Sequence, residues 1–485
     1  MKHLPIEDMH KIGWRSPTVV SKPRRIALQI GLACGVGVMI GLLLLVSPLL
    51  AIGCTLLVIV IVAALQKPVL LCYLTVMAIA LTSGMERGKP IPLLRTNEAV
   101  LMLTAAIAFI IVLTRKNRYP IRFHGLEVAI FILVLGTTII PGSYYLIRGS
   151  NLFFEDAVVL LAPIQYLILF WIFAYLPGSN RERVGLIKFM LFCGAIVAIV
   201  GVLQAAKVGF VIDFLRNWYG SAQFAEALRV NRITSLLGAW NALGIFMMIN
   251  LLIVWSFGIS RPHDLGWALI LFVGGACISC LVLTGSFAGM VGLIFGIALA
   301  TRLLGVYFSK RNIFLFFIVL IAIVISGTIF REQVLYRWNQ QFGYGGAVPE
   351  TLVYRLNLWE SFYWPVIKNN LFWGTNPTIP SYYSWPYTES QFLDLLFSFG
   401  IIGFFSFLFW NAITLRTLLQ RFYQHGSFLR TVSSIAITIV IVLFVDGFTN
   451  AVFSYSGVID YLWIILALIT AQEGLKHRQL VGGNI

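Results

Sequence analysis

Long apolar runs separated by short polar segments constrain this chain of 485 residues more than any other feature. A transmembrane helix needs about 20 consecutive apolar residues. Backbone amides in hydrocarbon must be hydrogen-bonded within their own helix or in a closed barrel. Hydrophobic residues make up 59% of the chain and charged residues only 11%, whereas a soluble domain carries about 25% charged residues. The sequence therefore predicts an all-α, polytopic transmembrane helix bundle.

We predict fourteen membrane spans, or twelve to thirteen if the adjacent pairs that meet near Pro48 and Gly285 each form one kinked helix. The spans are expected near 26–45, 48–65, 68–83, 98–114, 125–147, 156–176, 185–205, 238–258, 267–285, 287–302, 313–329, 392–415, 430–450 and 456–471. They divide the chain into a basic N-terminal tail (1–25), an N-terminal bundle (26–205), a loop (206–237), central spans (238–329), a larger loop (330–391), C-terminal spans (392–471) and a C-terminal tail (472–485).

The distribution of basic residues predicts the orientation of the bundle. A net charge of +16 is compatible with nucleic-acid binding, but the basic residues lie in short loops between apolar runs, which is typical of membrane topology. With a cytoplasmic N-terminus, 23 of the 35 Lys and Arg residues fall on the cytoplasmic side. We therefore expect a bacterial inner-membrane protein with both termini in the cytoplasm and no nucleic-acid partner. The long loops 206–237 and 330–391 then lie on the periplasmic side.

The sequence lacks the residue patterns expected for disulfide, metal-dependent and nucleotide-dependent chemistry. All six cysteines fall within apolar runs, and the Cys277–Cys280 pair has no histidine or acidic neighbour. All six histidines are cytoplasmic in the predicted topology. No phosphate-binding loop, HExxH or dinucleotide fingerprint occurs. We expect no metal and no cofactor, so that periplasmic chemistry would depend on arginine, carboxylate, tyrosine and backbone groups.

The first long loop carries two arginines near its end. Arg229 and Arg232 are three residues apart and would share a face on a helix. Two guanidinium groups aimed at one place suit a phosphate, whose oxygens they bind in pairs. Alternatively, both side chains reach lipid headgroups beside a span. Asn241 and Gly244 follow at the entrance to that span.

The second long loop predicts an amphipathic helix over Pro349–Tyr363, lying on the membrane surface. Arg355 and Trp359 lie on this helix. A turn containing Gly374 follows, and then an aromatic stretch over 382–387 that suits either a glycan platform or an interfacial aromatic belt.

Thr388 and Gln391 form a capping-box pattern before the next apolar run. This pattern places Glu389 in the first turn of the following helix, where the helix dipole favours a carboxylate. Its role is then either structural or that of a general base beside arginines. Asp394, one turn further along, is a candidate partner for Glu389, because an acid at the edge of a bilayer is costly enough to suggest a function.

Four patches in a fixed order resemble the bacterial O-antigen polymerase/O-antigen ligase superfamily, multi-span enzymes with a GT-C-like fold. The patches are Pro92–Glu98 with Arg95; Arg232 with Asn241 and Gly244; Tyr354, Arg355 and Trp359 leading to Asn370–Gly374; and Glu389–Leu393 followed by Gly400 and Gly403. Together they cover most of the chain from about 90 to 470.

The resemblance implies a glycan donor carried on a polyprenyl diphosphate. Arg232 and Arg355 would hold the diphosphate. Ligases of this family place a histidine eleven residues before the first glycine of the Gly-x-x-Gly pair, and here that position is Glu389, which favours a polymerase. Two further departures are Trp240, where proline is common, and the segment 284–288, where many relatives have Ser-Arg.

We therefore predict a metal-independent, inverting glycosyltransferase that polymerises undecaprenyl-diphosphate-linked repeat units into O-antigen or exopolysaccharide. Its catalytic residues are predicted to be Glu389, Arg355 and Arg232, and its substrate-binding residues Arg229, Asn241, Trp359, Gly374, Asp394 and Arg95. Expected partners are the lipid-linked donor and acceptor, membrane lipids, a chain-length regulator and a flippase. The alternatives are a ligase and a non-enzymatic transporter, although a transporter would carry more charge deep within its spans.

Overall fold

The computed structural model describes residues 58–59, 61–89, 91–114, 125–150, 152–220, 222–305, 327–342, 349–379, 388–424 and 427–470, and isolated positions between 313 and 325. The chain divides into two compact units, Met1–Lys67 and Pro68–Ile485. In the first unit the structure describes helical residues between 58 and 66.

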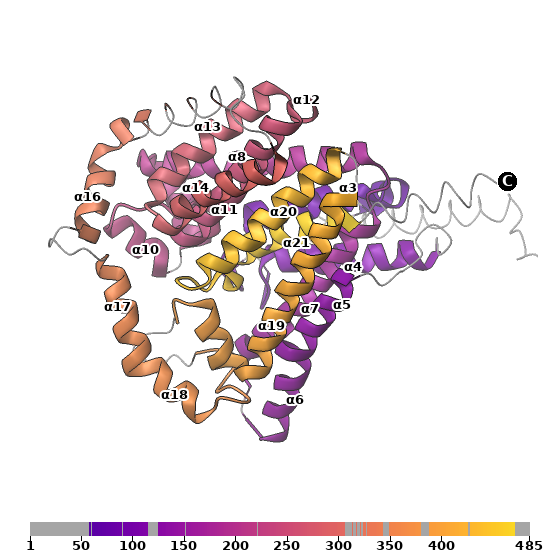
Figure 1. Cartoon of the computed structure of the whole chain (residues 1–485), viewed down its shortest axis with the longest axis vertical. Coiled ribbons are helices and arrows are strands. Elements are labelled where there is room, and N and C mark those ends of the chain that lie inside the picture. Colours follow the sequence, from indigo (N-terminus) through magenta and orange to yellow (C-terminus); the bar gives the residue numbers. More distant parts are fainter. Residues whose placement is uncertain are drawn as a thin grey trace, which may run out of the picture. The chain divides into compact units, whose positions relative to one another are not determined.

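The second unit is all-α over the described residues, as predicted (Figure 1). Its first helices are α3 (Val69–Thr82), α4 (Thr96–Thr114), α5 (Gly125–Val134), α6 (Ile140–Ile147), α7 (Phe154–Tyr175), α8 (Asn180–Ala205), α9 (Gly209–Tyr219) and α10 (Ala222–Arg229). They are followed by α11 (Trp240–Ser260), α12 (Pro262–Leu265), α13 (Trp267–Thr284), α14 (Phe287–Leu304), α16 (Arg331–Phe342), α17 (Glu350–Leu358), α18 (Trp364–Asn369), α19 (Gln391–Gln424), α20 (Ser427–Asp446) and α21 (Ser456–Thr470).

Among the described residues, nine helices are long and apolar enough to cross a membrane, and two shorter apolar helices, α3 and α21, accompany them. Eleven of the predicted spans coincide with one of these helices. The predicted spans near 26–45, 48–65 and 313–329 lie wholly or mostly outside the described residues. Gly285 adopts a left-handed conformation and ends α13, so α13 and α14 are two helices rather than one kinked span.

Helix α11 lies at the centre of the bundle. It packs against α8, α13, α14, α20 and α21 (Figure 1). Its most apolar stretch of 18 residues is wholly buried. A helix that is apolar on every side suits either a protein core or a lipid-facing span, and α11 occupies the core of the bundle. The N-terminal end of α11 therefore places Trp240 and Asn241 among the ends of several other helices.

The described residues of the large second loop are mostly helical, and those around α18 pack on the first half of α19. A π-helical turn, Trp359–Tyr363, joins α17 to α18. Tyr363 and Ile367 are fully buried against Phe397 of α19, with partly buried apolar neighbours around them. The helix predicted over Pro349–Tyr363 is therefore confirmed, with a π-bulge at its end. Its predicted place on the membrane surface stays a prediction.

A break in α19 receives the turn that follows α18. Gly400 has non-helical backbone angles (φ 62°, ψ −162°). Backbone groups of α19 next to this break therefore form hydrogen bonds with the loop. The backbone N–H of Ile401 donates to Leu371 O (2.9 Å), and that of Thr375 donates to Phe397 O (2.6 Å). The loop is thereby fixed to α19 by backbone hydrogen bonds as well as by apolar packing.

Candidate functional site

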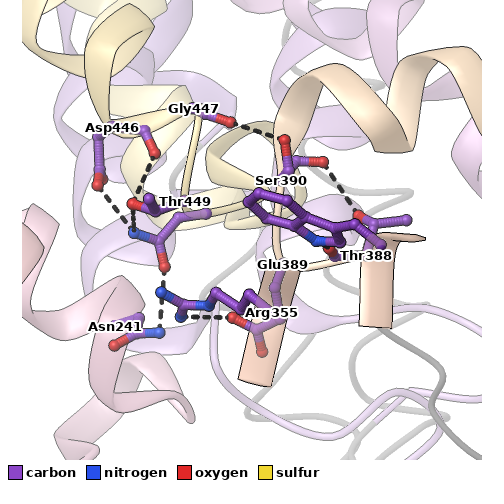
Figure 2. Close-up of polar contacts among 10 residues, drawn as sticks. Asn241, Arg355, Thr388, Glu389, Ser390, Asp446, Gly447 and Thr449 are labelled. Atoms are coloured by element: carbon purple, nitrogen blue, oxygen red, sulfur yellow. Dashed lines mark hydrogen bonds and ion pairs between the residues drawn. The ribbon is translucent and has the colours of Figure 1, made fainter. Parts of the chain in front are cut away.

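Arg355 and Glu389 meet in an ion pair, although 34 residues separate them along the chain. Nη2 of Arg355 donates to Oε2 of Glu389 at 2.8 Å. The side chains are 19% and 24% exposed, respectively, so the pair is largely shielded from solvent and still reachable. Figure 2 shows the arginine from α17 pointing at the carboxylate, which lies just before α19.

Three contacts hold the segment that carries Glu389. The indole N–H of Trp359 donates to Thr388 O at 2.7 Å. The hydroxyl of Ser390 donates to Gly447 O at 3.3 Å (Figure 2). The N–H of Gln391 donates to the same carbonyl at 2.8 Å. Between these anchors Glu389 has φ +53°. A left-handed conformation costs a residue with a side chain about 1–2 kcal/mol, and such strain gathers at functional sites.

The predicted capping box is wrong. Helix α19 begins at Gln391, so Glu389 precedes the helix instead of lying in its first turn. The Gln391 side chain accepts a hydrogen bond from the N–H of Phe453 (2.7 Å) and does not cap its own helix. Asp394 is not paired with Glu389 either: its Oδ1 accepts from the Thr388 hydroxyl at 3.5 Å. Tertiary contacts have replaced the local pattern.

A chain of one carboxylate and two amides lies beside the ion pair. Nδ2 of Asn450 donates to Oδ1 of Asp446 at 2.8 Å, and Nδ2 of Asn241 donates to Oδ1 of Asn450 at 3.2 Å. Asp446 ends α20, Asn450 lies in the α20–α21 connection and Asn241 is the second residue of α11. This carboxylate–amide chain fixes the Asn241 side chain close to Arg355 (Figure 2).

Tyr455 connects the two parts of the site. Its side chain lies close to that of Asn241 and within electrostatic reach of both Glu389 and Arg355. Burial raises the pKa of the Tyr455 hydroxyl above its ordinary value, and the carboxylates of Glu389 and Asp446 act in the same direction. The phenol is therefore protonated at neutral pH and can donate a hydrogen bond. Nothing in the local sequence pattern singled out Tyr455 or Asn450.

Arg232 is buried and held at the end of α13. It is 8% exposed, and its Nε donates to Thr284 O at 2.8 Å while Nη2 lies 3.5 Å from Gly285 O. Its guanidinium also stacks on Trp240, 4.4 Å from the ring centre. A cation at the carbonyl end of a helix is stabilised by the helix dipole. Thr284 and Trp240 therefore contact the same arginine.

Arg229 is arranged differently. Helix α10 ends at this residue, and Asn231 takes a left-handed conformation (φ +51°). The Arg229 side chain is 79% exposed and lies 3.9 Å from the carboxylate of Glu226. The prediction that Arg229 and Arg232 share a helix face is therefore wrong. Arg232 approaches the site through Trp240, the chain neighbour of Asn241.

Two more predicted substrate contacts have packing partners in the structure. Gly374 (φ +78°) lies so close to α19 that an added Cβ would be 2.5 Å from Ser398 O. Arg95 lies before α4, where its Nη1 is 3.5 Å from the Ser456 hydroxyl and its N–H donates to Glu98 (3.0 Å). Burial lowers the pKa of Arg95. Since Ser456 follows Tyr455 directly, this arginine adjoins the site from the side of α21.

The described residues contain no group of three or more His, Cys, Asp or Glu side chains that could hold a metal ion. Cys72, Cys193, Cys277 and Cys280 are free and buried. Of the histidines, only His263 lies among the described residues. The groups gathered at the site are therefore guanidinium, carboxylate, amide and phenol.

Residues 267–408 match the family model of O-antigen ligase. The matched segment includes the ion pair Arg355–Glu389, together with Trp359, Gly374 and Asp394, and ends before Asp446. A search of curated proteins finds no match to the chain. Such a domain implies an enzyme of O-antigen processing, of either the polymerase or the ligase kind. The chain is therefore a multi-pass membrane protein that carries, over residues 267–408, a domain of the O-antigen polymerase and ligase superfamily.

Proposed function

We propose that this protein is a glycosyltransferase that polymerises oligosaccharide repeat units carried on undecaprenyl diphosphate, at the periplasmic face of the bacterial inner membrane. The observation that carries the proposal is the 2.8 Å contact between Arg355 and Glu389. It brings a diphosphate-binding group and a proton acceptor to one point from two separate elements. Exopolysaccharide and O-antigen units are equally suitable substrates for such chemistry.

The donor binds through its diphosphate. Arg355 and Arg232 hold the phosphate oxygens, since a planar guanidinium matches them in pairs. A diphosphate carries more negative charge than the single carboxylate now bound to Arg355, and therefore displaces it. Arg229, exposed on α10, adds positive charge at the approach to the site. Negative charge on the leaving diphosphate grows as the glycosidic bond breaks, and fixed cations stabilise that change most.

Displacement from Arg355 frees the Glu389 carboxylate to act as general base. The acceptor hydroxyl oxygen attacks the anomeric carbon, the bond from that carbon to the diphosphate oxygen breaks, and the hydroxyl proton passes to Glu389. A single displacement of this kind inverts the anomeric centre. A positioned base contributes about 10²–10⁴-fold to such a rate.

The acceptor is positioned by neutral hydrogen-bonding groups. The carboxylate–amide chain holds the Asn241 amide beside Arg355, and the Tyr455 phenol lies close to Asn241 and within electrostatic reach of Glu389. Amide and phenol groups suit sugar hydroxyls, which both donate and accept. Trp359 and Asp394 both contact Thr388 and shape that side of the site. Arg95 supports the α21 side and Gly374 the junction with α19. A flippase and a chain-length regulator are the proposed protein partners.

A ligase is the second candidate, because the matched family model is described as that of O-antigen ligase. A ligase would transfer a finished polymer from the same lipid carrier to a lipid or protein acceptor. The arginine roles would be unchanged. Glu389 would then serve where ligases of the family have a histidine.

Glycan profiles of a deletion strain complemented with single variants test the proposal. Arg355→Ala and Glu389→Gln should each leave single repeat units, at membrane levels equal to those of the unsubstituted protein. Glu226→Gln, which removes an exposed carboxylate and leaves its partner Arg229 charged, is the matched control and should give a full ladder. A ladder of normal length in either site variant refutes the assigned roles. A ladder that forms but stays on the carrier lipid identifies the ligase instead.

A further inference from the structure

Helix α9, in the first long loop, has an apolar surface wider than the protein covers. Three of its apolar side chains, spaced four residues apart, are buried: Val211, Leu215 and Tyr219. Three aromatic side chains with the same spacing are exposed, at 73%, 45% and 39%: Phe210, Phe214 and Trp218. We call these three the aromatic stripe. The polar residues of the helix occupy a third side: Asp213, Arg216 and Asn217.

The three sides follow one another around the helix. Residues advance about 100° each, so the aromatic stripe directly adjoins the buried stripe, and the two form one continuous apolar arc of about 180°. The polar residues fill much of the remaining arc. An amphipathic helix on the surface of a soluble protein needs only one buried arc and one polar arc. Helix α9 has a further apolar arc without cover from the described protein.

The ends of the apolar helices α3 and α8 fix where α9 lies. Its first residue follows the end of α8 after three residues, 206–208. At its other end the Tyr219 hydroxyl donates to Leu81 O near the end of α3, and the N–H of Glu86 donates to Trp218 O at 3.2 Å. Helices α3 and α8 pack against each other. Both ends of α9 are therefore held at the level where α3 and α8 leave the apolar part of the bundle.

We propose that α9 is an interfacial helix whose aromatic stripe inserts into the headgroup and upper acyl region of the lipid bilayer. Amphipathic helices at this depth bury an aromatic and aliphatic face while their charged face stays in water. Phenylalanine and tryptophan suit this zone. The bilayer is the occupant because the aromatic stripe continues from the ends of the membrane helices, and because the exposed Asp213–Arg216 ion pair (3.2 Å) lies on the water side.

An anchored α9 has a consequence for the rest of the loop. Helix α10 and the turn to Arg232 follow within thirteen residues of Tyr219. A helix fixed in the plane of the headgroups therefore keeps that arginine near the depth at which lipid phosphates lie. The position of this surface helix does not depend on the reaction that the protein catalyses.

Spin-label accessibility in lipid nanodiscs of phosphatidylethanolamine and phosphatidylglycerol tests the proposal. The full chain carries a nitroxide at Phe214→Cys in one sample and at Arg216→Cys in the other. These positions are both exposed, on the same helix, and nearly opposite around it. The unsubstituted chain measures any signal from the native cysteines. Collision with oxygen, which concentrates in the bilayer, should exceed collision with a water-soluble nickel chelate at 214, and the ratio should reverse at 216.

Two results overturn the proposal. Equal access of the nickel chelate to both positions places the aromatic stripe in water. An immobile label at 214 that neither reagent reaches places it against a second copy or another protein. Phe210→Cys provides a second probe on the same stripe if Phe214→Cys does not fold, and must give the same ratio as expected at 214.

Discussion

Substitutions of Glu389 can separate the free-energy cost of its backbone conformation from the catalytic role of its carboxylate. We compare Glu389→Gly with Glu389→Ala. Both variants lose the carboxylate and therefore the ion pair with Arg355, so this loss cancels in the comparison. What differs is the left-handed backbone (φ +53°), which glycine adopts freely and alanine does not.

The magnitude follows from two opposing terms. Alanine retains a left-handed strain of about 1–2 kcal/mol, whereas glycine loses about 0.5–1 kcal/mol more chain entropy on folding. The Gly variant should therefore be more stable than the Ala variant by about 0.5–1 kcal/mol. At Glu226, which lies within helix α10, the same pair of substitutions should show the reverse order, because glycine costs about 1 kcal/mol in a helix.

Two measurements on each purified variant check this prediction. Unfolding free energies come from titration with a denaturing detergent in mixed micelles, and polymerisation is measured on lipid-linked repeat units in reconstituted vesicles. Both Glu389 variants should lose about 10²–10⁴-fold in rate, and both Glu226 variants should retain it. An Ala variant at 389 as stable as the Gly variant would disprove the strain. Polymerisation by either 389 variant at the unsubstituted rate would disprove the role as base.

Three further substitutions test the surroundings of the site. Gly374→Ala should lower the unfolding free energy by at least about 2 kcal/mol, because the added Cβ would lie 2.5 Å from a backbone oxygen. The control is Gly149→Ala, where the backbone is also left-handed but an added Cβ would meet no atom within 4 Å. It should lower the unfolding free energy by only about 1 kcal/mol. Arg232→Lys loses the stacking and one or more carbonyl bonds and should cost about 1–3 kcal/mol in the same titration, while Arg229→Lys stays within about 0.5 kcal/mol. Asn450→Leu removes the middle of the carboxylate–amide chain, and should raise the KM for the acceptor and cost about 1–3 kcal/mol of stability.

Hydropathy alone predicted most of the fold, because a span needs only composition and length. The helix expected over 125–147 has the bounds Gly125–Ile147 in the structure. Its interior contains a π-helical segment, Leu135–Ile139, where Gly136 lies so close to α19 that an added Cβ would overlap Ser406. This segment depends on contact with another helix, and no local pattern in residues 125–147 reports that contact.

The contact between Arg355 and Glu389 could not be predicted from the sequence. The residues flanking each of them marked it as a candidate, but their contact requires the loop to fold back on α19. That fold depends on the break at Gly400 and on backbone hydrogen bonds such as Thr375 N–H to Phe397 O (2.6 Å). Local reasoning instead placed Glu389 inside a capped helix. The cap failed because the Gln391 side chain has a better partner in Phe453, 62 residues away.

The two arginines of the first loop show where a local signal was present and was outweighed. A spacing of three residues predicts a shared face only if the helix continues through both positions. Asn231 lies between Arg229 and Arg232, and asparagine is one of the few residues that tolerate the left-handed conformation in which helices often end. With φ +51° at Asn231, the chain turns and sends Arg229 outward to Glu226 and Arg232 inward to Trp240. The proposed diphosphate grip therefore needs Arg232 and Arg355, one from each loop, and not a pair of arginines on one helix.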